Sequence, residues 1–221
     1  MKVTSRMVPL QNVEKMLCLD ADGKYGIPYI GAKVQDFDET TKWIPFNYVQ
    51  SYKKDPSKIG VHFYIHDYQF ERIWTSPDMY IDKLKKFRYV CTPEFSLYNN
   101  TPLALQIWNH YRKHWIGAYY QMHGVNIIPT ITWALPQSFE FCFAGEPKNN
   151  IVCVSTVGKM ITKDFTDIFF IGYEEMKKRL KPTKILINGV VPKEIEDEVI
   201  PMKRAYKLFG KTYVKNEDQE K

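Results

Sequence analysis

Two carboxylates follow short apolar segments, at positions where a catalytic or binding site could form. Asp67 comes shortly after segment 61–65, and Glu94 comes shortly after segment 89–91. If these segments are neighbouring parallel strands, both carboxylates converge at the carboxyl edge of the sheet, where such sheets carry their sites. Paired carboxylates can act as general acid and base or bind a divalent cation. The alternative is structural, because Asp at a strand–helix junction often caps the next helix.

Asn109 and Arg112 lie three residues apart on the strongest predicted helix, 103–123, and therefore face a similar direction. An apolar stripe beside them predicts that this helix packs on the sheet. The stripe consists of Ala104, Trp108, Tyr111, Trp115, Ala118 and Met122. Arg112 either extends to water or points across the sheet edge at an anion or at Glu94. Asp67, Glu94 and Arg112 are therefore the candidate catalytic residues.

Other strand ends carry groups that could bind a ligand. Trp133 ends the predicted strand 126–133, where its ring could stack on a base or sugar, or could equally close the core. Ser155 to Lys159 reads Ser-Thr-Val-Gly-Lys after a strand, and such a segment could seat a phosphate on backbone N–H groups. The candidate ligand-binding residues are Ser96, Asn109, Trp133, Ser155 and Lys159.

Two pairs of histidines are spaced four residues apart. His110 and His114 share one side of the predicted helix, but the Glu of an HExxH zinc motif is missing and no third ligand is indicated. We therefore expect surface histidines. His62 and His66 lie on a predicted strand about 13 Å apart, too far to bind one ion. No metal site is predicted, and the cofactor is unknown.

Several common chemistries lack their motif. No GxGxxG or GxxxxGK[ST] follows a predicted strand, so dinucleotide and P-loop sites are not indicated. No Ser-His-Asp arrangement or activated cysteine can be assembled. The four cysteines form no CxxC pair, and Cys91 and Cys153 fit buried apolar strands, as expected in a reducing compartment.

The composition is that of a globular protein with a core. The 221 residues are 44% hydrophobic and 25% charged, with a net charge of +6. This basic excess favours anionic partners but is less than a strong DNA binder carries. No segment has the length of a signal peptide core or a membrane span, so we expect a soluble, cytoplasmic protein without a membrane partner.

Apolar strands alternate with helices and predict an α/β fold with a mainly parallel sheet of about five βα units. The predicted strands are Val61–Ile65, Tyr89–Cys91, Asn126–Trp133, Ile151–Val154 and Lys184–Ile187; the predicted helices are Pro77–Phe87, Leu103–His123, Ser138–Phe143 and Lys163–Leu180. We favour a partial or irregular TIM-like barrel over an open doubly wound sheet. Within one domain, we expect a lead-in over 1–60, an α/β core over 61–192 and a charged extension over 193–221.

Several strings of the sequence, taken together, resemble an uncharacterised family of bacteria, phages and mobile elements, the domain of unknown function 4417. They are His62–Glu71, Thr92–Tyr98, Pro102–Arg112, Ile116–Tyr119 and Ile128–Trp133. The resemblance covers roughly residues 26–188 and implies no particular activity. Two departures matter. Glu94 stands where the family has Asp, and Ala134 and Leu135 follow Trp133 where the family has Gly-Asp, which weakens an enzymatic interpretation.

Two functions therefore stay open. The first is a phage- or mobile-element-associated protein that binds or acts on a nucleotide or nucleic acid at the strand ends. The second is a non-enzymatic accessory protein that binds a host or phage protein. Whether the chain is an enzyme stays undecided at this level.

Overall fold

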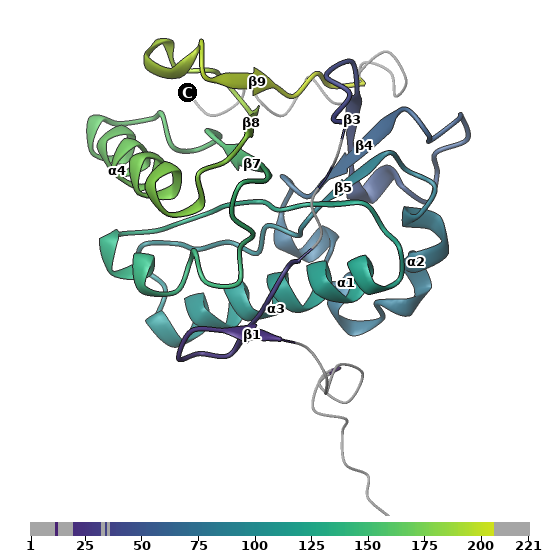
Figure 1. The fold of residues 1–221 in the computed structure, drawn as a ribbon, viewed down its shortest axis with the longest axis horizontal. Helices are drawn as coiled ribbons and strands as arrows, with labels where there is room; N and C mark the ends of the chain where they lie inside the picture. Colours follow the sequence, from purple (N-terminus) through teal and green to yellow (C-terminus); the bar gives the residue numbers. More distant parts are fainter. Residues whose placement is uncertain (1–11, 13–19, 32–33, 35, 206–221) are drawn as a thin grey trace, which may run out of the picture.

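The computed structural model describes residues 12, 20–31, 34 and 36–205. Two parallel sheets form the centre of the molecule (Figure 1). The first has the order β3 (Lys42–Pro45), β4 (Ile59–His62), β5 (Tyr89–Cys91), β6 (Ile127–Ile128). The second has the order β7 (Ile151–Ser155), β8 (Lys184–Asn188), β9 (Val199–Pro201). A small antiparallel hairpin, β1 (Ala21–Asp22) and β2 (Ile27–Pro28), precedes them.

Single parallel bridges join the two sheets on both sides. Thr130, just after β6, pairs with Cys153 of β7, and Trp43 of β3 pairs with Arg204, just after β9. The Trp43 backbone donates to the carbonyl of Lys203 (2.9 Å) and accepts from Ala205 (3.0 Å). The seven parallel strands therefore follow one another in a ring that has two joints only one residue pair wide.

The α/β class with mainly parallel pairing is confirmed, whereas the TIM-like barrel is not. A regular barrel needs continuous ladders and a crossover helix after each strand. Here two joints are single bridges, and 3-10 helices stand after β3, β6 and β8 in place of full helices. These 3-10 helices cover Phe46–Tyr48, Pro136–Glu140 and Lys193–Ile195. Apart from these two single-pair joints, the two ladders are separate sheets, which fits an open α/β arrangement.

In the described part of the chain, four α-helices lie against the strands. They are α1 (Arg72–Thr75), α2 (Asp78–Leu84), α3 (Leu103–Met122) and α4 (Lys163–Leu180). Helix α4 begins where predicted, because the Thr162 side chain accepts a hydrogen bond from the backbone of Phe165. In Figure 1, α4 lies beside β7 and β8, while α3 runs along the opposite end of the molecule near the β1–β2 hairpin.

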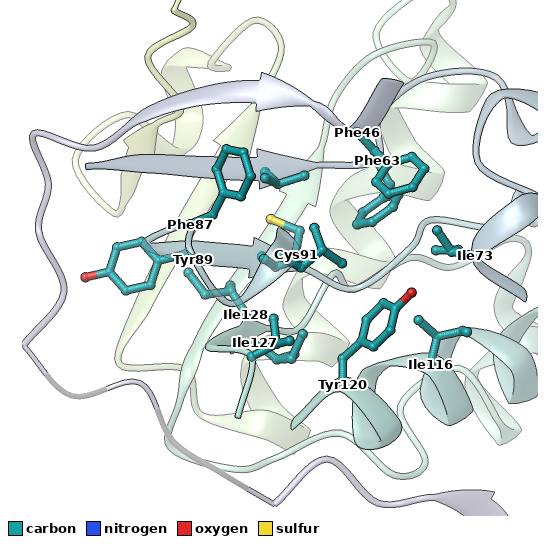
Figure 2. Close-up of a cluster of buried hydrophobic side chains, with 14 of the residues drawn as sticks. Phe46, Phe63, Ile73, Phe87, Tyr89, Cys91, Ile116, Tyr120, Ile127 and Ile128 are labelled. Atoms are coloured by element: carbon teal, nitrogen blue, oxygen red, sulfur yellow. The ribbon is translucent and has the colours of Figure 1, made fainter. Parts of the chain in front are cut away.

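The core divides into two clusters because successive strand residues point to opposite faces. Ile151, Cys153 and Leu186 face the cluster built on β3 to β6, part of which Figure 2 shows. Their neighbours on β7 and β8 pack under α4 in the second cluster. These are Val152, Val154, Ile185 and Ile187. Cys91 and Cys153 are buried and free as expected, Cys142 is also buried and free, and Cys18 lies outside the described residues.

The predicted apolar stripe of α3 is only half right. Trp115 and Ala118 are buried, but Trp108 is 36% exposed and Met122 55% exposed. Between residues 106 and 114 the helix instead buries polar side chains, namely Gln106, His110, Lys113 and His114. The expectation of surface histidines on α3 is therefore wrong, because tertiary contacts override the apolar pattern.

The division into lead-in, core and extension stays a prediction. Strand β3 lies in the predicted lead-in and β9 in the predicted extension, and both pair with core strands. Residues 206–221 of the extension lie outside the described part of the chain.

Candidate functional site

The carboxyl ends of β4, β5 and β7 carry the predicted site residues, and two of them are directly bonded. Asp67 begins the 3-10 helix Asp67–Gln69 after β4. Its carboxylate accepts hydrogen bonds from the backbone N–H (3.0 Å) and the Oγ hydroxyl (2.8 Å) of Ser96, which follows β5. Asp67 therefore holds the loop after β5 in place, which is a structural role compatible with the edge of a site.

Glu94 lies in that loop and is partly buried. Burial is the main cause that raises the pKa of Glu94 to about 7, and the negative charge of Asp67 raises it further. Lys159, Lys113 and a hydrogen bond with Thr132 act in the opposite direction. A carboxyl group with this pKa is present in both protonation states near neutral pH and could accept or donate a proton.

Of the two lysines that lower the pKa of Glu94, Lys159 has the larger effect. Glu94 and Lys159 are both partly buried. Burial lowers the pKa of Lys159, while the charge of Glu94 raises it. Lys159 follows Gly158, which has a φ of +72°, in the loop after β7. Glu94 after β5 and Lys159 after β7 therefore influence each other's charge.

Ser155, the last residue of β7, is tied to the neighbouring strand. Its Oγ accepts hydrogen bonds from the backbone of Val157 (3.2 Å) and from the amide side chain of Asn188 (3.2 Å). Asn188 is the last residue of β8 and only 2% exposed. These contacts fix the start of the loop that carries Lys159.

Arg112 reaches the same edge but does not pair with Glu94. Its guanidinium lies 3.7 Å from the ring centroid of Phe95 and donates to a carboxylate oxygen of Glu71 (2.6 Å). Arg112 Nε also donates to Asn109 Oδ1 (3.1 Å), and the Asn109 amide donates to the carbonyl of Ser96 (2.8 Å). Arg112 and Asn109 thus hold the loop after β5 from the side of α3.

Trp133 does not stand at the mouth of the sheet. It is 3% exposed, and its indole N–H donates to the carbonyl of Ile168 in α4 (3.3 Å). The ring packs so closely on α4 that a Cβ at Gly172 would lie 2.1 Å from the indole nitrogen. Of the two roles that the sequence left open for Trp133, the buried ring fits core packing and does not fit stacking on a ligand.

Two exposed tyrosines, which the sequence analysis did not single out, flank the bonded pair of Asp67 and Ser96. Tyr68 is 78% exposed and Tyr98 is 62% exposed. Tyr68 directly follows Asp67, and Tyr98 comes two residues after Ser96. Their position beside site residues in the sequence was the available signal. Exposed rings of this kind can stack on bases.

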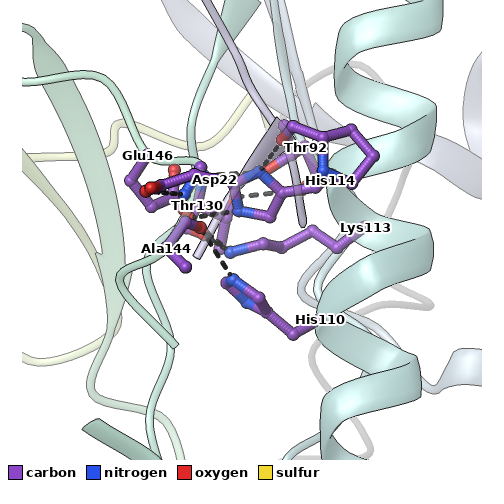
Figure 3. A network of polar contacts seen from close by, with 10 residues as sticks. Asp22, Thr92, His110, Lys113, His114, Thr130, Ala144 and Glu146 are labelled. Carbon is purple, nitrogen blue, oxygen red and sulfur yellow. Dashed lines mark hydrogen bonds and ion pairs between the residues drawn. The ribbon is translucent and has the colours of Figure 1, made fainter. Parts of the chain in front are cut away.

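A second polar cluster lies deeper, where α3 meets the segment 144–146 (Figure 3). Lys113, 1% exposed, donates to Glu146 Oε1 (2.5 Å) and to the carbonyl of Thr130 (2.9 Å). His114 Nε2 lies 3.0 Å from the same oxygen of Glu146, and His110 Nε2 lies 3.0 Å from the carbonyl of Ala144. Glu146 was not predicted as a site residue, because it follows His114 by 32 residues and carries no motif.

Burial and mutual charge set the protonation of this cluster. Burial lowers the pKa of His114, although Glu146 acts against this, and burial with the charge of Lys113 lowers the pKa of His110 far more. Burial alone would raise the pKa of Glu146, but Lys113 and His114 hold it below its usual value. At neutral pH, Glu146 is therefore an anion among two neutral imidazoles and one lysine.

The chain matches known sequences but no known structure. Residues 19–207 match the family described as a domain of unknown function, DUF4417. The Gene 1 protein of Mycobacterium phage L5 is 38% identical over 150 residues, and the Gene 1 protein of Mycobacterium phage D29 is 34% identical over 150 residues. No solved structure matches.

The similarity to the phage proteins covers 68% of this chain, but only 65% of the L5 protein and 55% of the D29 protein. Among the described residues, no helix is long and apolar enough to cross a membrane. The family match, by contrast, extends over nearly the whole described region. This chain therefore belongs to the DUF4417 family, with relatives among mycobacteriophage proteins.

Proposed function

We propose that this phage-associated protein binds a nucleotide, or the nucleotides of a single-stranded nucleic acid, at the carboxyl edge of β4, β5 and β7. The observation that carries the proposal is the hydrogen bonding of Asp67 after β4 to Ser96 after β5 (2.8 and 3.0 Å), which fixes the loop that holds Glu94. The raised pKa of Glu94 and the charge of Lys159 support it. Perturbed titratable groups at this edge of a parallel sheet are typical of binding and catalytic sites.

The groups around this pair suit the parts of a nucleotide. The Lys159 ammonium group suits a phosphate. Tyr68 and Tyr98, both exposed, suit the faces of bases. The net charge of +6 would attract an anionic ligand from a distance.

Glu94 would give this site a reaction as well as a ligand. With a pKa of about 7 it could remove a proton from a bound water or hydroxyl and return one to a leaving group. Asp67, Asn109 and Arg112 are already engaged with the loop after β5, so their role would be to position Glu94.

A direct binding experiment tests the proposal. Fluorescence anisotropy with a labelled short single-stranded DNA, and thermal shift with nucleoside mono-, di- and triphosphates, should both detect binding by the intact chain. Lys159→Met and the double variant Tyr68→Ala/Tyr98→Ala should each weaken binding at least tenfold, because a charge or two stacking surfaces are lost. Matched controls are Lys178→Met and Tyr29→Ala, whose side chains are also exposed but lie on α4 and next to β2.

Two results would contradict the proposal. One is the absence of binding to every nucleotide and oligonucleotide at millimolar and micromolar concentrations, respectively. The other is binding that the site variants and the control variants weaken equally, which would indicate non-specific attraction to a basic surface.

The second candidate is the non-enzymatic accessory protein. It is favoured by exposed apolar side chains at the start of α3, where Leu103 is 41% exposed and Leu105 52% exposed. In that case Leu105→Ser would abolish binding to a protein partner, and Glu94→Gln would leave phage-associated activity unchanged.

A further inference from the structure

We propose that His110, His114 and Glu146 form a binding site for one divalent transition metal ion, with Zn²⁺ the best match. This buried cluster is separate from the edge site of Glu94 and Lys159. The ligand atoms that these three residues can offer all lie within 4.8 Å of one another. Two imidazole nitrogens and one carboxylate form a typical zinc donor set, which leaves a fourth position for water or substrate.

The hydrogen bond of His110 leaves one of its ring nitrogens with a free lone pair. A carbonyl oxygen can only accept, so the contact between His110 Nε2 and the carbonyl of Ala144 requires the proton on Nε2. In a neutral ring Nδ1 is then a bare acceptor. That Nδ1 is buried and has no hydrogen-bond partner, and Glu146 Oε2 is in the same condition. Such orphaned acceptors are rare in protein interiors.

His114 presents a second conflict that a cation would resolve. Its Nδ1 lies 2.9 Å from the carbonyl of Pro28 and must donate to it, which leaves a lone pair on Nε2. This lone pair faces Glu146 Oε1 at 3.0 Å, and a carboxylate oxygen is also an acceptor. Either a shared proton or a metal ion must lie between them.

The outward hydrogen bonds match those of metal-bound histidines. In metal sites the ring nitrogen that does not bind the ion usually donates to a backbone carbonyl or carboxylate, which fixes the tautomer. Both histidines do so here, toward Ala144 and Pro28. Tetrahedral bonds of about 2.1 Å place the donor atoms about 3.4 Å apart, so only a small closure of the cluster is needed.

Gly145 fixes the segment that supplies Glu146. Its φ is +73°, and a Cβ there would lie 2.6 Å from the Pro28 carbonyl and 2.8 Å from His114 Nδ1. Its N–H donates to Asp22 (2.9 Å), and its carbonyl accepts from Ile30 (3.0 Å). The chain therefore reaches Glu146 in a fixed position beside the histidines, as a rigid site requires.

Lys113 would compete with the metal ion for the carboxylate of Glu146. Its ammonium group donates to Glu146 Oε1, while Oε2 is left over. Since Lys113 also donates to the carbonyl of Thr130, it keeps one partner if Glu146 turns toward an ion. Removal of this positive charge should therefore strengthen metal binding.

The test measures metal binding to the full chain after dialysis against a chelator. Titration with Zn²⁺ should give one equivalent bound, and Co²⁺ should give the visible absorption of a tetrahedral ion. The Co²⁺ complex should lack the near-ultraviolet thiolate band that cysteine ligands would produce. His110→Asn and Glu146→Gln should each weaken Zn²⁺ binding at least a hundredfold, whereas His66→Asn, at an exposed histidine, should not change it.

Lys113→Met provides the decisive comparison. If the site binds metal, this variant should bind Zn²⁺ at least tenfold more tightly than wild type and recover thermal stability when Zn²⁺ is added. The proposal is overturned if wild-type protein binds no Zn²⁺ or Co²⁺ at 100-fold molar excess, or if Co²⁺ shows a thiolate band. It is also overturned if a folded His110→Asn variant binds as wild type does. If both ligand variants fail to fold, the wild-type stoichiometry, the Co²⁺ spectrum and Lys113→Met still decide the question.

Discussion

The edge site and the buried cluster on α3 contain similar types of residue but differ in how their polar groups are hydrogen-bonded. At the edge, Asp67 and Arg112 are partly exposed and satisfied by neighbours, and Glu94 is the group left to titrate. In the cluster, polar groups are almost fully buried, and two acceptor atoms of His110 and Glu146 have no partner. An exposed site can use water to complete its hydrogen bonds, whereas a buried one needs a proton or ion.

Lys113 connects the two regions. It donates to Glu146 in the cluster, and its charge also lowers the pKa of Glu94 at the edge. A change in the cluster that moves or neutralises Lys113 would therefore raise the pKa of Glu94. The two regions are best tested by variants that separate them.

The largest expected effect comes from the buried cluster. Glu146→Gln leaves the Lys113 ammonium without its anion, and the loss of one partner of a buried ion pair costs about 3–5 kcal/mol of unfolding free energy. Urea unfolding in the presence of a chelator measures this. Glu140→Gln, in the exposed ion pair with Lys24, should show no measurable change. If the two variants lost equal amounts of unfolding free energy, the buried ion pair would be no more important for stability than the exposed one.

Residues of the edge could be grouped from the sequence, whereas those of the cluster could not, for a physical reason. In parallel sheets the strand ends meet at one edge, so Asp67 and Glu94 could be expected together from strand patterns alone. Glu146 could not, because it lies on a loop after a 3-10 helix and reaches His114 only through tertiary contacts. The pattern on α3 also misled, since Lys113 and the histidines are buried on a different side of the helix from the predicted apolar stripe.

The predicted strands also differ in how closely their bounds match those of the structure. Segments 89–91 and 184–187 became strands within one residue, because continuous β-branched and aromatic runs are buried on both faces. Segment 126–133 forms a strand only over Ile127–Ile128, then a single bridge at Thr130. Pro129 lies between them and lacks the N–H that a continuous ladder requires.

The next largest effect is expected where Trp133 packs against α4 in the core, away from the edge site. Gly172→Ala places a methyl group where the Trp133 indole lies, at distances of 2.1–2.4 Å, so helix or ring must move. We expect a loss of about 3 kcal/mol. Gly31→Ala, whose Cβ would lie 3.7 Å from the Tyr29 ring, should change stability by less than about 0.5 kcal/mol. Thermal or urea unfolding checks both variants. If Gly172→Ala left the free energy of unfolding unchanged, Trp133 would not be tightly packed in the core and would again be a candidate ligand-binding residue.

A smaller effect concerns the pH dependence of stability at the edge. Glu94 has a folded pKa of about 7 against an ordinary value of 4.5, so between these values the folded protein keeps a proton that the unfolded chain loses. Stability therefore falls as pH rises from 4.5 to 7 and shows no further Glu94 contribution above that range. We expect the fall to be about 2 kcal/mol after allowance for partial exposure.

Glu94→Gln should remove this fall, since the amide does not titrate. Urea unfolding of wild type and variant from pH 4.5 to 8 measures the difference, with Glu174→Gln on the exposed side of α4 as the control. If wild type and Glu94→Gln follow parallel curves, Glu94 is not the neutral-pH titrating group of the edge site.

The smallest expected effect separates geometry from charge at Arg112. Arg112→Lys keeps the positive charge but loses the fork that donates to both Glu71 and Asn109, and it weakens the contact with the Phe95 ring. We expect a loss of about 1 kcal/mol in unfolding free energy. The loop after β5 should also become less rigid, because Asn109 holds its Ser96 carbonyl. Faster amide hydrogen exchange at residues 94–98, with unchanged exchange at 144–146, would locate the effect at the edge. Equal acceleration in both segments would mean that the edge and the cluster behave as one cooperative unit.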